Sequence, residues 1–413
     1  MLSILKHRNF RYLWLGGLVS TVGDYALYIA LPFYIYNLTG SALATGLMFI
    51  IETIPGLFVG PFAGVFADIW NNRNIMIISD IIRGVVILLL IMVQSIDYLW
   101  IIYVVAFLQS VTSKFFYPAK NKLLPRLLGK EKLVLANSLD SMSTDITSLI
   151  GPSLGGLLMI SFGIFGIVVI DSLSFFISAM LIWNIRSSAA LGQNSISNTS
   201  TSLLSKLNIW NDWVNGIRVI GSEFTVISIF ILMSIIMFGQ GIISVLLFVF
   251  VQQALGGGSL EMGWMISAQG IGGIIGGLIM AKYGNRLLSV RTIILGFSLT
   301  GILLTIMANM TQISYVLLIL PFVGITVVCA EVSVSTFFQK STPDEYRGRI
   351  TSSYRMTISI IMMAGMAFAT LSGDYLKSST LITIAGVIFI FGALVMWFRS
   401  YANIHSSSES SEA

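Results

Sequence analysis

The chain alternates long apolar runs with short polar segments over its 413 residues. Each run is about 20 residues or longer, which is enough for a helix to cross a ~30 Å hydrocarbon core. The runs are continuously apolar, whereas the strands of a membrane barrel alternate, so the pattern predicts helices. We expect twelve of them, over residues 10–36, 42–67, 74–94, 98–117, 140–160, 163–185, 225–251, 260–281, 290–309, 312–336, 353–376 and 379–399.

The longest polar stretch divides these runs into six and six. Residues 186–223 open rich in Ser and Asn and then become amphipathic, which indicates a cytoplasmic linker that ends in a helix on the membrane surface. The predicted domains are therefore a six-helix bundle over 1–185, this linker, a second six-helix bundle over 224–400, and a disordered cytoplasmic tail over 401–413. The predicted fold class is an all-α membrane protein with two pseudo-symmetric bundles.

Composition supports a membrane protein, and charge sets its orientation. Hydrophobic residues make up 56% of the chain and charged residues 10%, where a soluble protein has about 25% charged residues. The net charge of +5 comes from Lys and Arg that lie almost entirely in loops on one side of the predicted topology, such as Lys120 to Lys132. By the positive-inside rule, both termini are expected in the cytoplasm, and the chain is expected in the cell membrane. Because these bases follow the topology, nucleic acid is not an expected partner.

Small residues recur at every fourth position in four of the predicted helices, and such a face lets two membrane helices approach closely. The four series are Gly56-Gly60-Gly64, Gly151-Gly155, Gly272-Gly276 and Gly365-Ala369-Gly373. We expect the helix of Gly151, which Pro152 should kink, to pack against the helix of Gly272. The two halves would then rock or slide along such seams. The expected hinge residues are Gly151, Pro152, Gly155, Gly156, Gly272 and Gly276.

Two motifs resemble signatures of the major facilitator superfamily. The loop Gly64-xxx-Asp68-xxxx-Arg73 is similar to that family's signature between its second and third helices, although Asn71-Asn72 stands where the family has Gly and a base. The run from Gly151 to Gly156, Gly-Pro-Ser-Leu-Gly-Gly, resembles the core of a signature of the drug-exporting antiporters.

Two further stretches are similar to the branch of macrolide, enterobactin and peptide-antibiotic exporters. They are Gly23-Asp24 with the following Leu38-Thr-Gly-Ser41, and the segment from Gln339 to Arg349. The resemblance covers the whole chain and implies a bacterial exporter that works by alternating access.

The resemblance also implies a conformational latch at the inner membrane edge. Asp68 is expected to dock on the positive N-terminus of the helix that begins near Thr351 in the outward-open state, and to release it in the inward-open state. Asp80 and Arg83 are three residues apart and can pair on one helix face, forming an inner-gate ion network with Lys114. The predicted latch and gate comprise Gly64, Asp68, Arg73, Asp80, Arg83 and Lys114.

Acidic residues inside the apolar runs are the strongest indication of a functional site, because a carboxyl is costly to bury in a membrane. Asp24 lies about 14 residues into the first predicted helix and Glu52 about 10 residues into the second, so both are expected near mid-membrane. Asp171 lies nearer the outer surface. A carboxyl in a low-dielectric cavity can load and release protons near neutral pH. These three are the candidate proton-coupling or substrate-binding residues, and a purely structural role stays open for each.

The predicted function is proton-coupled efflux of an amphipathic small molecule by a monomer in the lipid bilayer. A symporter or a lysophospholipid flippase of the same superfamily is the alternative. An intramembrane enzyme or a receptor is disfavoured, since His7 and His405 lie near the termini and Cys329 is the single Cys. Neither a metal, nor a cofactor, nor a phosphate-binding loop is expected.

Overall fold

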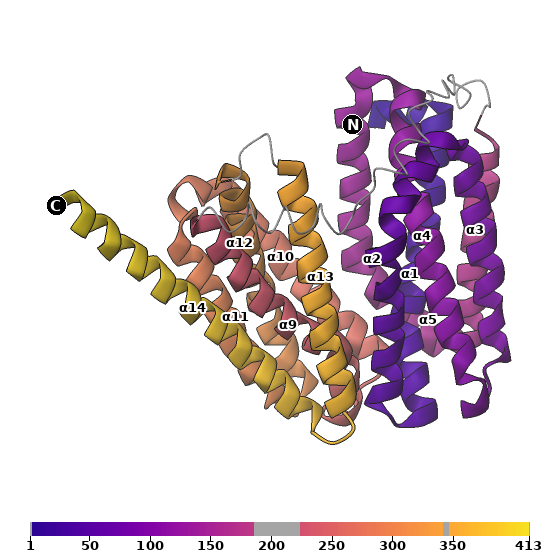
Figure 1. The fold of residues 1–413 in the computed structure, drawn as a ribbon. Helices are drawn as coiled ribbons and strands as arrows, with labels where there is room; N and C mark the ends of the chain where they lie inside the picture. Colours follow the sequence, from indigo (N-terminus) through magenta and orange to yellow (C-terminus); the bar gives the residue numbers. More distant parts are fainter. Residues whose placement is uncertain (1, 186–223, 342–346, 413) are drawn as a thin grey trace. The chain divides into compact units, whose positions relative to one another are not determined.

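The computed structural model describes residues 2–185, 224–341 and 347–412, which are helical and contain no strand. The helices are α1 Arg8–Thr39, α2 Ala42–Ile69, α3 Asn72–Leu88, α4 Leu99–Leu128, α5 Leu133–Trp183, α9 Phe224–Gln253, α10 Ser259–Leu287, α11 Val290–Ala308, α12 Ile313–Ser341, α13 Arg347–Ser372 and α14 Ser378–Glu412 (Figure 1). Short 3-10 helices are η1 Leu2–Lys6, η2 Leu89–Met92, η3 Ile96–Tyr98 and η4 Lys130–Lys132. The predicted linker, 186–223, lies outside the described residues, and α14 runs into the tail that was expected to be disordered.

α5 contains two of the predicted crossings. The described part of the chain has 11 helices long and apolar enough to span a membrane. α5 alone has 51 residues, about 76 Å as a straight helix and far more than one crossing needs. Gly163 interrupts it with φ 65° and ψ −176°, a left-handed backbone that glycine adopts without a steric penalty. With a segment on each side of Gly163, the all-helical membrane fold and its twelve segments are confirmed.

The described helices form two compact units. The first is built on α1, α3, α4 and α5, with α2 from Leu47 onward, and it also holds Gly258–Gly263 at the start of α10. The second is built on α9, α11 to α14, the rest of α10, and Ser41–Gly46. Apart from these two short segments, each unit therefore contains six membrane-length segments.

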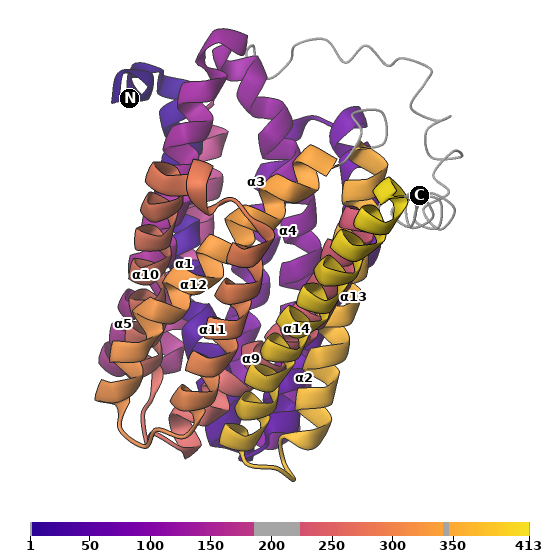
Figure 2. The same cartoon turned by 90° about the vertical axis from the view of Figure 1, so that its left-hand side faces the viewer.

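Helix packing inside each unit follows from the apolar faces. In the first unit, α1 packs along α5, and α3 packs against both α4 and α5. Leu13, Met76, Leu123 and Ile182, one from each of these helices, are almost fully buried in one apolar cluster. In the second unit, α9 packs against α13 and α14, and α11 packs against α12 and α14 (Figure 2). The contacts of the first unit place polar residues of α1, α3 and α5 next to one another.

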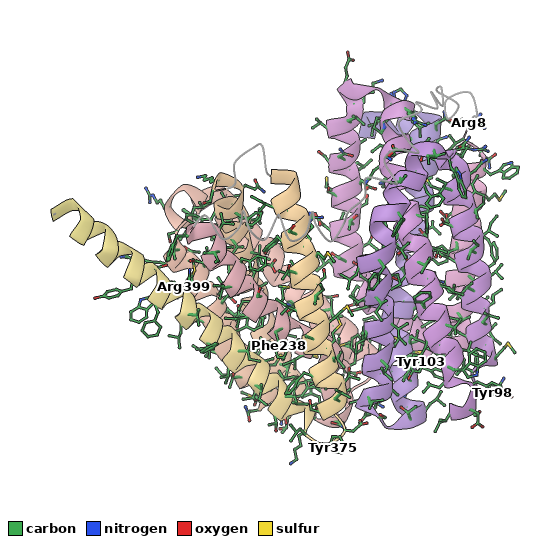
Figure 3. All side chains as sticks on the ribbon, in the orientation of Figure 1. Arg8, Tyr98, Tyr103, Phe238, Tyr375 and Arg399 are labelled. Carbon is green, nitrogen blue, oxygen red and sulfur yellow. The ribbon has the colours of Figure 1, made fainter. Side chains whose placement is uncertain are left out.

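The outer surfaces of both units are apolar. Leu318, Phe58 and Leu371 expose 67%, 65% and 65% of their surface, which suits contact with lipid rather than water. Arg8 and Tyr98 lie at opposite ends of the first unit (Figure 3). Phe58 belongs to this first unit, and an exposed apolar surface is expected of a unit that crosses a bilayer.

Candidate functional site

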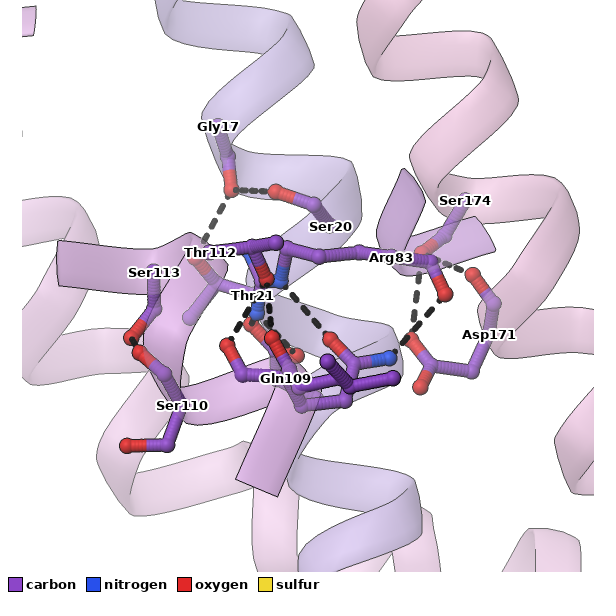
Figure 4. Close-up of polar contacts among 12 residues, drawn as sticks. Gly17, Ser20, Thr21, Arg83, Gln109, Ser110, Thr112, Ser113, Asp171 and Ser174 are labelled. Carbon is purple, nitrogen blue, oxygen red and sulfur yellow. Dashed lines mark hydrogen bonds and ion pairs between the residues drawn. The ribbon is translucent and has the colours of Figure 1, made fainter. Parts of the chain in front are cut away.

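Arg83 of α3 is the centre of a polar site inside the first unit (Figure 4). One guanidinium nitrogen, Nη2, donates to both carboxyl oxygens of Asp24 on α1, at 2.9 and 3.1 Å. Nε donates to Oε1 of Gln109 on α4 at 2.9 Å, and Gln109 Nε2 donates back to the Arg83 carbonyl at 3.0 Å. The guanidinium also lies 4.0 Å from the ring centroid of Phe175 on α5. Four helices therefore hold one cation in a defined orientation.

Asp171 of α5 approaches the same site beside Gly23 of α1. It is completely buried. Its Oδ1 accepts from the Ser174 hydroxyl at 3.3 Å, and its Oδ2 has no hydrogen-bond partner. A Cβ at Gly23 would collide with Asp171 Oδ1 and would lie 2.6 Å from the Ser174 hydroxyl. The absence of a side chain at Gly23 lets α1 pack against α5 here, which places Asp171 next to Asp24.

Asp80 is the third carboxyl around Arg83, but it is not the ion-pair partner that the sequence suggested. Asp80 is completely buried near the Ser178 hydroxyl, and neither carboxyl oxygen makes a well-formed hydrogen bond. Arg83 instead pairs with Asp24. The expectation of an Asp80–Arg83 pair on one helix face was wrong, because the guanidinium reaches across to α1 rather than back along α3.

Glu52 and Lys114 lie at the border of this site. The charged neighbours of Glu52 on α2 are Asp24, Lys114 and Arg83, and its backbone carbonyl accepts from the Ser110 hydroxyl of α4 at 2.5 Å. The Lys114 ammonium lies near Gly56 of α2. Among the described residues, Lys114 forms no ion pair, so the predicted network of Asp80, Arg83 and Lys114 is not formed.

The predicted latch residues have partners of their own within the first unit. Asp68 pairs with Lys122 of α4 at 2.5 Å, and Lys122 also donates to the Gly64 carbonyl at 2.9 Å. Arg73 donates to the carbonyls of Ile182 and Trp183 at the end of α5. The docking of Asp68 on the helix that starts at Arg347 stays a prediction.

The hinge glycines pack differently from the expected seam. A Cβ at Gly155 would lie 2.8 Å from Ala26 Cα of α1, and one at Gly151 would lie 2.9 Å from the Tyr25 ring. Gly272 and Gly276 of α10 lie against the α12 backbone, at Pro321 and Ile325.

Gly156 and Pro152 contact the first turn of α10, which belongs to the same unit. A Cβ at Gly156 would collide with the Ser259 carbonyl, and one at Gly263 would collide with the Pro152 carbonyl. The start of α10 thus packs against α5, while Gly151 and Gly272 pack against α1 and α12. A pairing of the glycine faces of Gly151 and Gly272 stays a prediction.

Sequence reasoning missed Gln109, Phe175, Ser174 and Lys122. Gln109 could have been suspected as a polar residue in an apolar run. Lys122 was expected in the basic loop that follows that run, and nothing in the sequence marks Phe175 as the ring under a guanidinium. A second ion pair, Lys120–Asp140 at 2.7 Å, was also missed. In the described part of the chain, no group of three or more His, Cys, Asp or Glu side chains could hold a metal ion.

Comparison with known proteins covers the whole chain. Residues 1–413 match the family model described as transmembrane secretion effector. Macrolide efflux protein A of Streptococcus pyogenes is 23% identical over 392 residues, which is 94% of this chain and 95% of that protein. A putative bacilysin exporter of Bacillus subtilis is 24% identical over 394 residues, 94% of each chain. Among solved structures, a bacterial homologue of the iron transporter ferroportin in an inward-facing state has a similar fold, with a TM-score of 0.75 and 16% sequence identity. The alignment covers 95% of this chain and 98% of that chain.

Proposed function

Because the chain belongs to the transmembrane secretion effector family of major facilitator transporters, which are not enzymes, we propose that it exports an amphipathic small molecule in exchange for protons. The chain is a multi-pass membrane transporter with efflux proteins among its relatives. The proposal adds the coupling ion, the class of substrate and the place, the bacterial cell membrane with both chain ends in the cytoplasm.

The balance of charge around Arg83 is the observation that carries the proposal. Asp24, Asp80 and Asp171 are its acidic neighbours, and Glu52 and Lys114 add one charge of each sign at the border. Four carboxyls thus face two cations. An uncompensated charge inside a membrane protein is costly, so a neutral, proton-carrying form of some of these acids is favoured. This surplus of acids gives the site a capacity to take up protons.

Asp24 is the acid best placed to exchange its proton. Its side chain is 39% exposed, while that of Arg83 is 10% exposed, so a proton can reach Asp24 without opening the packed core. Protonation would remove the charge-assisted hydrogen bonds to Arg83. Arg83 could then turn to Asp171 or Asp80, whose buried oxygens lack partners. Since these acids lie on three helices, a change of partner would alter how α1, α3 and α5 pack, which is the step that alternating access requires.

The proposal is tested with everted membrane vesicles that contain the protein. A pH gradient, acid inside, is imposed, and the vesicle interior is followed with a pH-sensitive dye while erythromycin, ethidium or tetraphenylphosphonium is added. Proton-coupled export predicts that a transported compound accumulates in the vesicles and releases protons from them, and that nigericin abolishes both signals. Accumulation that is indifferent to the pH gradient would show that protons do not drive transport.

A further inference from the structure

The second unit contains a cavity of about 840 Å³ between α9, α12 and α13. Pockets of roughly 300–1,000 Å³ hold small organic molecules. Its lining includes Met233, Glu331, Phe338, Lys340, Tyr354 and Arg355. None of these residues belongs to the polar site around Arg83, so the cavity is a second candidate site.

The cavity is lined by one acid, Glu331, and two bases, Lys340 and Arg355. Glu331 is inside α12, and Lys340 is nine residues further on, roughly 13 Å along the helix, next to its C-terminus. Arg355, from the facing helix α13, lines the same space. Glu331, Lys340 and Arg355 form no ion pair with any residue that the structure describes. A ligand with a cationic end and an anionic end matches this arrangement.

Aromatic rings form an apolar wall in the same cavity. The ring centroids of Phe338 and Tyr354, which both line the cavity, are 4.8 Å apart, and the ring of Phe230 lies 6.1 Å from that of Tyr354. Met233 and Val334 extend the apolar lining. Such rings favour an aromatic or apolar group on the ligand.

We propose that this cavity binds a zwitterionic peptide of two or three residues with an aromatic side chain, its amino group toward Glu331 and its carboxylate toward Arg355 and Lys340. Three extended residues span about 10 Å, so such a peptide can reach from the acid to the long basic side chains. A purely cationic molecule would gain no attraction from either base, and a simple acid would gain none from Glu331. The proposal rests on the proposed export function and names the class of molecule carried.

The test compares three peptides on the purified full-length protein in lipid nanodiscs. Calorimetric titration measures the affinities of Ala-Phe, of N-acetyl-Ala-Phe, which lacks the cationic end, and of Ala-Phe-amide, which lacks the anionic end. Each cap removes a charge-assisted hydrogen bond, so each capped peptide should bind about 10- to 100-fold more weakly. Equal affinities for the three peptides, or no binding of Ala-Phe, would overturn the proposal.

Variants assign each end of the ligand. Glu331→Gln should abolish the preference for Ala-Phe over its N-acetyl form and keep the preference over the amide, while Arg355→Gln combined with Lys340→Gln should do the reverse. Lys377→Gln, which replaces an exposed base outside the cavity, should keep both preferences. Wild-type selectivity in Glu331→Gln would refute the assignment. Accumulation of Ala-Phe in everted vesicles with and without the pH gradient, measured with the same protein, reports separately whether the export function holds.

Discussion

At the residue scale, Arg83 and Asp24 form an ion pair whose two members we expect to be energetically coupled. Removing one partner of a fully buried ion pair costs about 3–5 kcal/mol; here Arg83 is buried but 39% of the Asp24 side chain is exposed, so losing Asp24 costs less than losing Arg83. Here the remaining charges would not be equivalent. Without Asp24, Arg83 still has Asp80 and Asp171 nearby, whereas without Arg83 all three acids lose their shared cation. The two substitutions should therefore have different effects, the first on coupling and the second on stability.

Asp24→Asn should lose uphill efflux driven by a pH gradient and retain downhill exchange. The amide keeps the shape of the side chain but cannot gain or lose a proton, so the substrate path stays while the coupling is removed. Vesicle transport with and without a pH gradient measures the two activities. Asp97→Asn, in the exposed η3 turn, serves as the control and should behave as wild type. Uphill efflux at the wild-type rate and pH dependence in Asp24→Asn would show that Asp24 is structural; Glu52→Gln would then be tested in the same way.

Arg83→Gln should destabilise the protein by about 3 kcal/mol, because the buried carboxyls of Asp80 and Asp171 lose the cation that they share. Thermal unfolding of the purified protein measures the loss. The double variant with Asp24→Asn removes both charges of the pair and should recover part of it, since one carboxylate fewer is left unmatched. If the losses of unfolding free energy in the two single variants simply add in the double variant, Asp24 and Arg83 are not energetically coupled.

The sequence identified acids that the structure brings close together, but not how they are paired. Asp24, Glu52 and Asp171 are recognisable because a carboxyl in an apolar run is rare and costly. The partner of Arg83 was mispredicted because spacing along a helix reports only neighbours on that helix. The contact between Asp24 and Arg83 depends on how α1 packs against α3, α4 and α5, and one sequence does not determine this.

At the element scale, small residues let helices approach, but the partner of each face is a property of the fold. Gly151 and Gly155, four residues apart, both pack against α1. Gly272 and Gly276 both pack against α12. The spacing could be predicted, whereas the choice of partner could not, because every glycine face in the chain is compatible with every other.

Gly155→Leu and Gly60→Leu should therefore differ sharply. A side chain at Gly155 meets the backbone of Ala26 and Tyr25, and backbone cannot move aside cheaply, so we expect a loss of about 3 kcal/mol and a low yield of folded protein. At Gly60 nothing lies within 4 Å of an added Cβ, so folded yield should match wild type. Size-exclusion chromatography and thermal unfolding of both variants test this. Equal yields would show that the α1–α5 contact tolerates a bulky residue.

At the scale of the whole molecule, one glycine and the distribution of charge determine how the chain crosses the membrane. Gly163 divides α5, which makes the number of segments even and would return the C-terminus to the side on which the chain begins. From Gly84 to Ser113 there is no Lys or Arg, while the stretch from Lys114 to Lys132 carries six. Both features could be derived from sequence because they depend on hydropathy and charge, not on which faces meet.

A topology experiment tests this orientation. A phosphatase reporter, active only outside the cell, should give signal when inserted between Gln94 and Ser95, beside the uncharged end of α4, and none when fused after Glu412. A fluorescent protein that folds only in the cytoplasm should give the opposite pattern at the two sites. The physical reason is that Lys and Arg are retained on the cytoplasmic face during insertion. This bias should weaken, and molecules of both orientations should appear, when five bases are replaced by Gln, namely Lys120, Lys122, Arg126, Lys130 and Lys132. Phosphatase activity at the C-terminus of the unmodified chain would mean that the termini lie outside and would overturn the predicted orientation.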